Sequence, residues 1–343
     1  MLVVFQRKVI YMGRPLRIHF QRLPCITYKS LLAGYAPPGS RTESLKDVYP
    51  NRTPKEIHIE ELSIPSSQPN TVRLSTLLLR RRDVASPPTH VIVYCQGMYL
   101  FFLCNFHLSL ATGNAGNPLH RIPVFTALLN AIPSLAILAP APRSYWTSSG
   151  AARPTQAGLT ADYTAALAFA ASRFPTSRLT IYGHSLGASI ALCLLAPHTD
   201  VSKAAAVVHG LVLENAFTSV PDMLRVLYPQ RWLPYRYLGP FVSDRWDARV
   251  AAASRTFPRD LARRAMVLVS ERDEVVPPAM GEEIFGALWA SEGNQEGSEG
   301  VGGSMRMQGA LGRFVVVGGA LHEDAWRYRE WTRAMKEYFE DIR

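Results

Sequence analysis

The chain has 343 residues, of which 48% are hydrophobic and 19% charged, which excludes global disorder and a coiled coil and suits an α/β domain with insertions. Its four cysteines have no CxxC spacing, which argues against a zinc site or a disulfide framework. The formal net charge is +10, but no nucleic-acid-binding motif accompanies it, so no nucleic-acid partner is expected.

The basic excess lies in an N-terminal arm, residues 1–54. Residues 1–82 hold 14 Lys and Arg against 5 Asp and Glu, whereas residues 83–343 hold 23 against 22. The opening apolar run is too short for a signal peptide. We therefore expect an intracellular protein whose residues 1–42 contact an anionic membrane surface. An Arg-rich, acid-poor start leaves a mitochondrial transit peptide as the alternative.

A single α/β domain, residues 55–343, is predicted to follow the arm. It begins with two segments of strand-like pattern. Lys55–Ile64 and Thr71–Arg81 each alternate apolar and polar residues, as half-buried strands do. Residues 66–70 between them have the composition of a turn. The pattern predicts an antiparallel β-hairpin.

An uncharged stretch comes next. Residues 84–120 contain no Lys, Arg, Asp or Glu, and 91–111 is apolar enough to span a bilayer. Gln96, Gly97 and His107 lie within it and favour a buried strand, a glycine turn and a helix instead. A membrane span stays as the alternative.

From there, short continuous apolar runs alternate with longer helical stretches. This alternation predicts an α/β fold with a mostly parallel central sheet and helices on both faces. The predicted strands are Val91–Cys95, Leu135–Ala139, Leu179–Tyr182, Leu211–Leu213, Met266–Val269 and Phe314–Val317, and the predicted helices cover 155–173, 185–196, 278–290 and 323–341.

Two insertions interrupt the alternation. Residues 217–253 are rich in aromatic residues and prolines and predict a small helical lid. Residues 291–312 hold seven glycines and few large apolar residues, which predicts a flexible loop without a packed role.

The pentapeptide Gly183–Gly187, with sequence G-H-S-L-G, stands between a predicted strand and a predicted helix. This context gives the G-x-S-x-G pattern its meaning, because a sharp strand-to-helix turn exposes the serine hydroxyl. The glycines let neighbouring backbone approach without a Cβ clash. Ser185 is therefore the candidate nucleophile, and the alternative is a chance pentapeptide at a glycine-bearing helix start.

A serine hydroxyl needs a base and an orienting acid, in the chain order serine, acid, histidine. His322 is the candidate base, because it follows the last predicted strand in a glycine-containing loop. His198 and His209 also follow Ser185 but lie beside helix and strand edges, where a structural role is expected.

Asp273 is the candidate acid, because it follows the predicted strand Met266–Val269 and has a short side chain. Glu271 and Glu274 share its loop and are expected to be solvated. Glu214 ends the preceding strand and is the second candidate acid, with a hydrogen-bonded structural carboxylate as its other reading.

An oxyanion hole needs a second amide from the loop after an earlier parallel strand. That loop is 95–98, so the backbone N–H groups of Met98 and Leu186 are the candidate donors. No metal or cofactor is implied by these residues.

These residues resemble the α/β-hydrolase superfamily. Within it they resemble the group of alpha/beta hydrolase domain-containing protein 13 and its bud-emergence-type relatives. The depalmitoylating domain-17 proteins are more distant relatives of that group. The resemblance implies the α/β-hydrolase fold, with Ser185 as nucleophile, Asp273 as acid and His322 as base. Members often carry an N-terminal membrane span, and this chain begins where such a span would end. The segments that carry the resemblance are 5–11, Gly158-Leu159, Asp162, 183–187, 214–221, 232–234, Asp273, 276–278 and 322–326.

The chain departs from the group at two loops. Gln96-Gly97 stands where the group usually has His-Gly, and residues 141–146 replace a glycine-containing Tyr-Arg-Gly-Tyr-Gly turn.

Three functions compete on these grounds. The first is a serine esterase or thioesterase acting through an acyl-enzyme on a small molecule, a lipid or an S-acylated protein. The second is a serine peptidase of the prolyl or aminopeptidase kind. The third is a weakly active membrane-associated scaffold, which the altered loop at Gln96 motivates.

Overall fold

The computed structural model describes ten stretches of the chain. The arm before residue 42 lies outside them, as do Met98 and His198. The described residues are 42–50, 54–66, 72–97, 117–149, 154–196, 206–232, 234–289, 298–301, 304–307 and 312–342.

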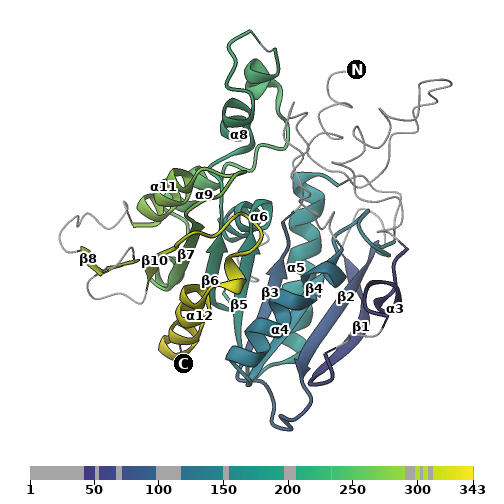
Figure 1. Ribbon diagram of the computed structural model, residues 1–343. Helices are drawn as coiled ribbons and strands as arrows, with labels where there is room; N and C mark the ends of the chain where they lie inside the picture. The colour runs from purple at the N-terminus through teal and green to yellow at the C-terminus, as the bar shows by residue number, and fades with distance from the viewer. Residues whose placement is uncertain are drawn as a thin grey trace, which may run out of the picture.

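One ten-stranded sheet forms the centre of the described structure, in the order β1-β2-β4-β3-β5-β6-β7-β10-β9-β8 (Figure 1). Strand β2 pairs antiparallel with β1 and β4, and the six strands from β4 to β10 are parallel. The predicted parallel sheet and antiparallel hairpin are confirmed. The strands are β1 Ile57–Ser66, β2 Val72–Arg81, β3 His90–Cys95, β4 Leu135–Pro140, β5 Arg178–His184, β6 Val208–Glu214, β7 Ala265–Ser270, β8 Ser298–Val301, β9 Ser304–Met307 and β10 Arg313–Val317.

Helices cover both faces of the parallel strands. Every residue of β3, β4 and β7 is buried, which requires a covered sheet on both sides. Helices α4 and α12 pack against each other (Figure 1), while α5, α6, α9 and α11 each pack against the next. The helices are α3 Leu45–Val48, α4 Ile122–Ala131, α5 Gln156–Arg173, α6 Leu186–Leu195, α8 Val220–Leu227, α9 Ala248–Ala253, α10 Arg259–Ala262, α11 Pro278–Trp289 and α12 Arg329–Asp341, with short 3-10 turns η1 Pro118–Arg121, η2 Pro234–Tyr237, η3 Gly239–Phe241 and η5 Ala325–Arg327.

The C-terminal helix is anchored on the sheet through a buried tyrosine. The hydroxyl of Tyr338 accepts from the N–H of Leu211 at 2.8 Å and donates to its carbonyl at 3.2 Å. A Cβ on Gly210 would lie 2.9 Å from that hydroxyl, so glycine makes room for the approach. Helix α12 is thereby tied to β6, the neighbour of β5 in the sheet.

The predicted lid segment, residues 217–253, does contain short helices. Helix α8 and the turns η2 and η3 project beyond the end of the sheet (Figure 1). Helix α9, at the end of the segment, instead packs against α6 and α11. Only the part from α8 to η3 therefore stands away from the body.

Helix α4 was not anticipated from the sequence, and the structure corrects two expectations. The predicted helix 323–341 is interrupted, because Tyr328 adopts extended backbone (φ −95°, ψ 146°) between η5 and α12. The predicted loop 291–312 contains the hairpin β8–β9, and β9 pairs with β10. The physical reason is the free edge of β10, whose backbone groups the hairpin satisfies.

The end of the expected arm is held against the domain. Helix α3 is a single turn, and the neighbouring Glu43 accepts hydrogen bonds from Asn117 at 3.1 Å and pairs with His120 at 2.7 Å. The indole of Trp146 donates to the carbonyl of Glu43 at 2.9 Å. Among the helices in the described stretches, none has the length and apolar character needed to cross a membrane.

Candidate active site

Ser185 stands at the turn between β5 and α6 with φ +54° and ψ −122°, a conformation that is rare for a non-glycine residue. The residue as a whole is 9% exposed. Its N–H donates to the carbonyl of Glu214 at 2.8 Å, which fixes the turn to the next strand. The strained geometry thus holds the serine at the carboxyl end of the parallel sheet.

The two glycines of the pentapeptide are required by close backbone approach. A Cβ on Gly183 would collide with Ala188 Cα, and one on Gly187 would collide with the carbonyl of Cys95 at the end of β3. Because backbone atoms cannot withdraw as side chains do, any larger residue would displace the turn. The spacing in the sequence therefore has a direct steric cause.

The predicted oxyanion donors are only partly described. Leu186 is the first residue of α6, so its N–H has no acceptor within the helix. Met98 lies outside the described residues. The two residues before it are placed: Gln96 is buried, and a Cβ on Gly97 would lie 3.2 Å from Ser185 Cβ. The loop after β3 therefore lies directly against the serine.

His322 and Asp273 meet across 49 residues of sequence. The imidazole Nδ1 lies 2.7 Å from Asp273 Oδ2, and both side chains are almost wholly buried. The other carboxylate oxygen, Oδ1, accepts from the N–H groups of Val275 and Val276 at 2.8 and 2.7 Å. The aspartate is thus oriented by its own loop and presents one oxygen to the histidine.

The charge around His322 favours its protonated form. Burial by itself would lower the pKa of His322, but the hydrogen bond and charge of Asp273 outweigh it, with contributions from Glu323 and Glu274, and the pKa is raised. A raised pKa suits a base that must hold a proton during turnover.

The backbone of His322 is also held, by residues that the sequence did not suggest. Its carbonyl accepts from Asn215 Nδ2 and from His184 Nε2, each at 2.9 Å, and its N–H donates to Glu274 Oε2 at 3.0 Å. The sequence predicts that Glu274 is solvated, but its carboxylate instead accepts from the backbone of His322. Four hydrogen bonds, including that of Asp273, fix one residue.

Asn215 connects three strand ends. It has φ +50°, which asparagine tolerates better than most residues. Its Oδ1 accepts from the N–H of Ser270 at 2.8 Å, and its Nδ2 donates to Ser270 Oγ at 3.0 Å as well as to His322. The end of β6 thereby links the end of β7 to the histidine loop.

His184, the second residue of the pentapeptide, is neutral and links Arg121 to the carbonyl of His322. Its Nε2 donates to a carbonyl, so Nδ1 accepts, and the guanidinium of Arg121 lies 3.2 Å from it. Burial, followed by the charges of Arg121 and His322, holds the pKa of His184 well below its ordinary value. Arg121 in turn pairs with Glu323 at 2.5 Å, beside the histidine.

This cluster does not suit a metal ion. Ligand atoms of His184, His322 and Glu323 lie within 4.8 Å of one another. Both ring nitrogens of His184 are already engaged, and Glu323 is paired with a buried guanidinium. A cation there would face the positive charge of Arg121.

Glu214, the second candidate acid, points away from the histidine. Its carboxyl group accepts from Tyr182 and, at 3.1 Å, from the indole of Trp331. Burial raises its pKa even though both hydrogen bonds oppose the shift. Glu214 is a structural carboxyl that joins β5, β6 and α12. Glu271, in the acid loop, accepts from the N–H of Gly319 at 2.7 Å.

A buried ion pair supports the loop after β4. Arg143 Nη2 lies 2.8 Å from Asp162 Oδ1, and Arg143 Nε and N–H donate to Asp162 Oδ2 at 3.0 and 2.8 Å. Ser66 donates to the same carboxylate at 2.6 Å. Although this loop departs from the glycine-containing turn of the resembling group, the arginine fixes it to α5.

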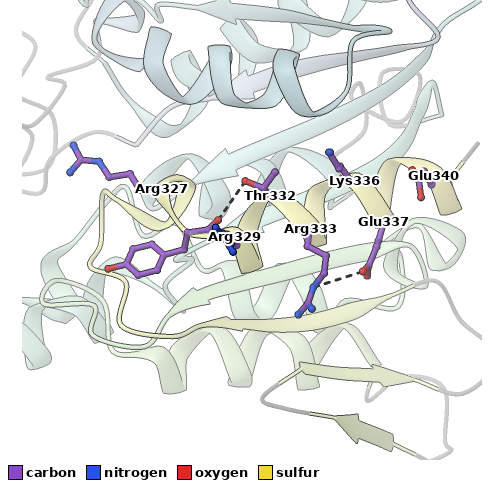
Figure 2. A pocket seen from close by; sticks show the side chains of 8 residues that line it. Arg327, Arg329, Thr332, Arg333, Lys336, Glu337 and Glu340 are labelled. Atoms are coloured by element: carbon purple, nitrogen blue, oxygen red, sulfur yellow. Dashed lines mark hydrogen bonds and ion pairs between the residues drawn. The ribbon is translucent and has the colours of Figure 1, made fainter.

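A shallow hollow lies elsewhere, along α12, and contains none of Ser185, Asp273 and His322. Figure 2 shows that its charged side chains diverge: Lys336 and Glu340 lie on one side of the helix, whereas Arg333 and Glu337, 3.9 Å apart, lie on the other. Since these charges do not converge, the hollow is no competitor for the substrate site.

The chain is similar in sequence to known proteins over part of its length. Residues 145–299 match the prolyl oligopeptidase family. Protein bem46 of Schizosaccharomyces pombe is 29% identical over 237 residues, 68% of each chain, and the alpha/beta hydrolase domain-containing protein WAV2 of Arabidopsis thaliana is 30% identical over 175 residues, 48% of this chain and 52% of that one.

Solved structures share the fold. The esterase Pf2001 of Pyrococcus furiosus has a TM-score of 0.55 at 15% identity, over 85% of this chain and 94% of that one. Carboxyl esterase 2 of Tuber melanosporum has a TM-score of 0.51 at 14% identity, over 84% and 87%. Together with the sheet order, these similarities show that the chain has the α/β-hydrolase fold, and its similarity in sequence to alpha/beta hydrolases supports a serine hydrolase.

Proposed function

We propose that the chain cleaves a carboxylic ester or thioester through an acyl-enzyme on Ser185. The observation that carries the proposal is the 2.7 Å contact between Asp273 and the Nδ1 of His322, which leaves Nε2 as the imidazole atom free to serve as base. Serine, acid and histidine follow β5, β7 and β10, whose carboxyl ends share one edge of the sheet.

In the acylation step, Ser185 Oγ forms a bond to the carbonyl carbon and its proton passes to His322 Nε2. The negative charge on the carbonyl oxygen is stabilised by backbone N–H groups, of which Leu186 is the described candidate and Met98 the expected second. The C–O or C–S bond then breaks, and His322 returns the proton to the leaving alcohol or thiol. Water repeats the sequence and releases the acid.

The substrate is expected to carry an apolar acyl group. The segment from α8 to η3 contributes leucine, tyrosine, tryptophan and proline near the carboxyl edge of the sheet. A lipid ester and an S-acylated protein both present such a group next to a cleavable carbonyl.

A fluorophosphonate probe tests the activated serine. Wild type should be labelled, whereas Ser185→Ala and His322→Ala should not be. Ser189→Ala is the matched control, because Ser189 lies on the same helix with its hydroxyl bonded to the carbonyl of Phe217 at 2.9 Å. Absence of labelling in well-folded wild type would refute the proposal, as would equal labelling of Ser185→Ala.

A peptidase is the second candidate, favoured by the match of residues 145–299 to the prolyl oligopeptidase family. Esters and thioesters of increasing acyl length, assayed beside proline-containing peptides, separate the two. Turnover of the peptides alone would replace the esterase proposal.

A further inference from the structure

We propose that the segment from α8 to η3, residues 220–241, docks the protein onto an anionic phospholipid bilayer. The first observation is the gathering of exposed apolar side chains on it. Six large hydrophobic residues are exposed in the described part of the chain, and four of them belong to this segment: Val226 (37%), Trp232 (79%), Tyr237 (57%) and Phe241 (66%).

The aromatic side chains are held outward by a folded scaffold. The guanidinium of Arg236 donates to the carbonyls of Arg225, Tyr228 and Pro229 at 3.2–3.3 Å. The hydroxyl of Tyr237 donates to the carbonyl of Arg231 at 2.8 Å. Because these bonds satisfy the backbone of the turn, the exposure of the rings is a property of the folded segment.

The charge of the segment suits an anionic surface. Residues 220–241 contain three arginines and one acidic residue, Asp222. Arg225 pairs with Asp222 at 2.8 Å, and no carboxylate of the described residues pairs with Arg231 or Arg236. Tryptophan and tyrosine beside arginine are the side chains that favour the headgroup region, where an apolar body and a polar tip are both accommodated.

The shape favours a bilayer over a protein partner. The segment projects beyond the end of the sheet (Figure 1), and its exposed apolar surface comes from a few side chains. A stable protein interface buries about 800 Å² on each partner. A projecting tip instead suits insertion to a depth of about 5–10 Å into the headgroup region.

Docking would turn the catalytic edge toward the membrane. Helix α8 begins six residues after Glu214, at the carboxyl end of β6, and Ser185 follows β5, the neighbouring strand. Leu321, another exposed apolar residue, directly precedes His322. The proposal does not depend on the reaction catalysed, since its test measures binding.

The test is vesicle flotation of the full chain carrying Ser185→Ala. Vesicles of phosphatidylcholine alone are compared with vesicles that also contain phosphatidylserine. We expect binding to the anionic vesicles, and at least about tenfold weaker partitioning after Trp232→Ala with Phe241→Ala. Val250→Ala is the control, because Val250 is as exposed as Phe241, at 66%, but lies on α9. The N-terminal arm is the same in every variant.

A second readout reports insertion directly. Brominated lipids quench a tryptophan that enters the bilayer, and Trp232 is far more exposed than the buried Trp146, Trp246 and Trp331. We expect quenching in wild type that Trp232→Phe abolishes while vesicle binding persists. Equal quenching in Trp232→Phe, or unchanged partitioning of the double variant, would overturn the proposal. A dimer that the double variant dissociates, without vesicle binding by wild type, would overturn it in favour of a second copy.

Discussion

Asn215 is expected to govern the position of His322, the proposed base, without touching substrate. Its side chain makes three hydrogen bonds, two to Ser270 and one to the carbonyl of His322. In Asn215→Ala the buried N–H of Ser270 loses its acceptor, which costs about 1–3 kcal/mol of the free energy of unfolding. Alanine at φ +50° adds about 1–2 kcal/mol.

The effect on catalysis should be larger than the loss of one weak contact suggests. The carbonyl of His322 would retain only its hydrogen bond from His184, so the imidazole would no longer be held on both sides. A displacement of about 1 Å at a catalytic group lowers the rate about 100-fold. We expect kcat to fall by that factor with little change in KM, measured on the ester identified by the acyl-length series.

Two further variants separate backbone strain from positioning. Asn215→Gly accepts a positive φ but lacks the amide, so it should recover part of the stability and little of kcat. Asn215→Asp keeps an acceptor for Ser270 but sets a carboxylate oxygen against the carbonyl of His322. Urea unfolding measures the stability of each. An Asn215→Gly enzyme with wild-type kcat would show the reasoning to be wrong.

Three other predictions concern the acid, the serine turn and the buried ion pair. Asp273→Asn should lower kcat about 10⁴-fold. Because the carboxylate raises the pKa of His322, the acidic limb of the kcat/KM profile should also move to lower pH. An acidic limb that stays in place would contradict the assignment of Asp273 as the acid. Gly187→Ala should prevent stable folding, because its Cβ would collide with the end of β3. At Gly286 an added Cβ would meet no atom within 4 Å, so Gly286→Ala should raise the free energy of unfolding by about 0.5–1 kcal/mol. Equal effects of the two variants in thermal denaturation would refute this. Asp162→Ala leaves a buried guanidinium unpaired and should cost about 3–5 kcal/mol in urea unfolding; a loss below 1 kcal/mol would argue against it.

The parts of the fold that the sequence predicted well are those in which the local pattern is strong. Strands β3 and β7 are buried throughout, so they read as continuous apolar runs. Burial alternates in the second half of β1 and at the start of β2, whereas β2 is buried without a break from Thr76 to Leu79. The break before α12 and the hairpin β8–β9 were missed. The hairpin depends on the open edge of β10, which the local sequence of residues 298–307 does not reveal.

The serine turn could be predicted from the sequence because its signal is local. Glycines two residues on either side of Ser185 are required by contacts with Ala188 and with the end of β3, and the strand and helix that flank them are themselves strongly patterned. The chain order of serine, acid and histidine then narrowed the candidates to a few loops.

Tertiary structure alone decided which carboxylate faces which partner. Asp273 follows the apolar strand β7 and Glu214 ends the apolar strand β6, yet Asp273 meets His322 whereas Glu214 accepts from Tyr182 and Trp331. The bracing of His322 by Asn215 joins residues 107 apart in the chain. Such contacts arise where the ends of parallel strands converge, and no spacing along the sequence records that convergence. The sequence by itself thus identified the strands that Ser185, Asp273 and His322 follow. The orientation of each side chain is set by the packing of the strand ends and α12.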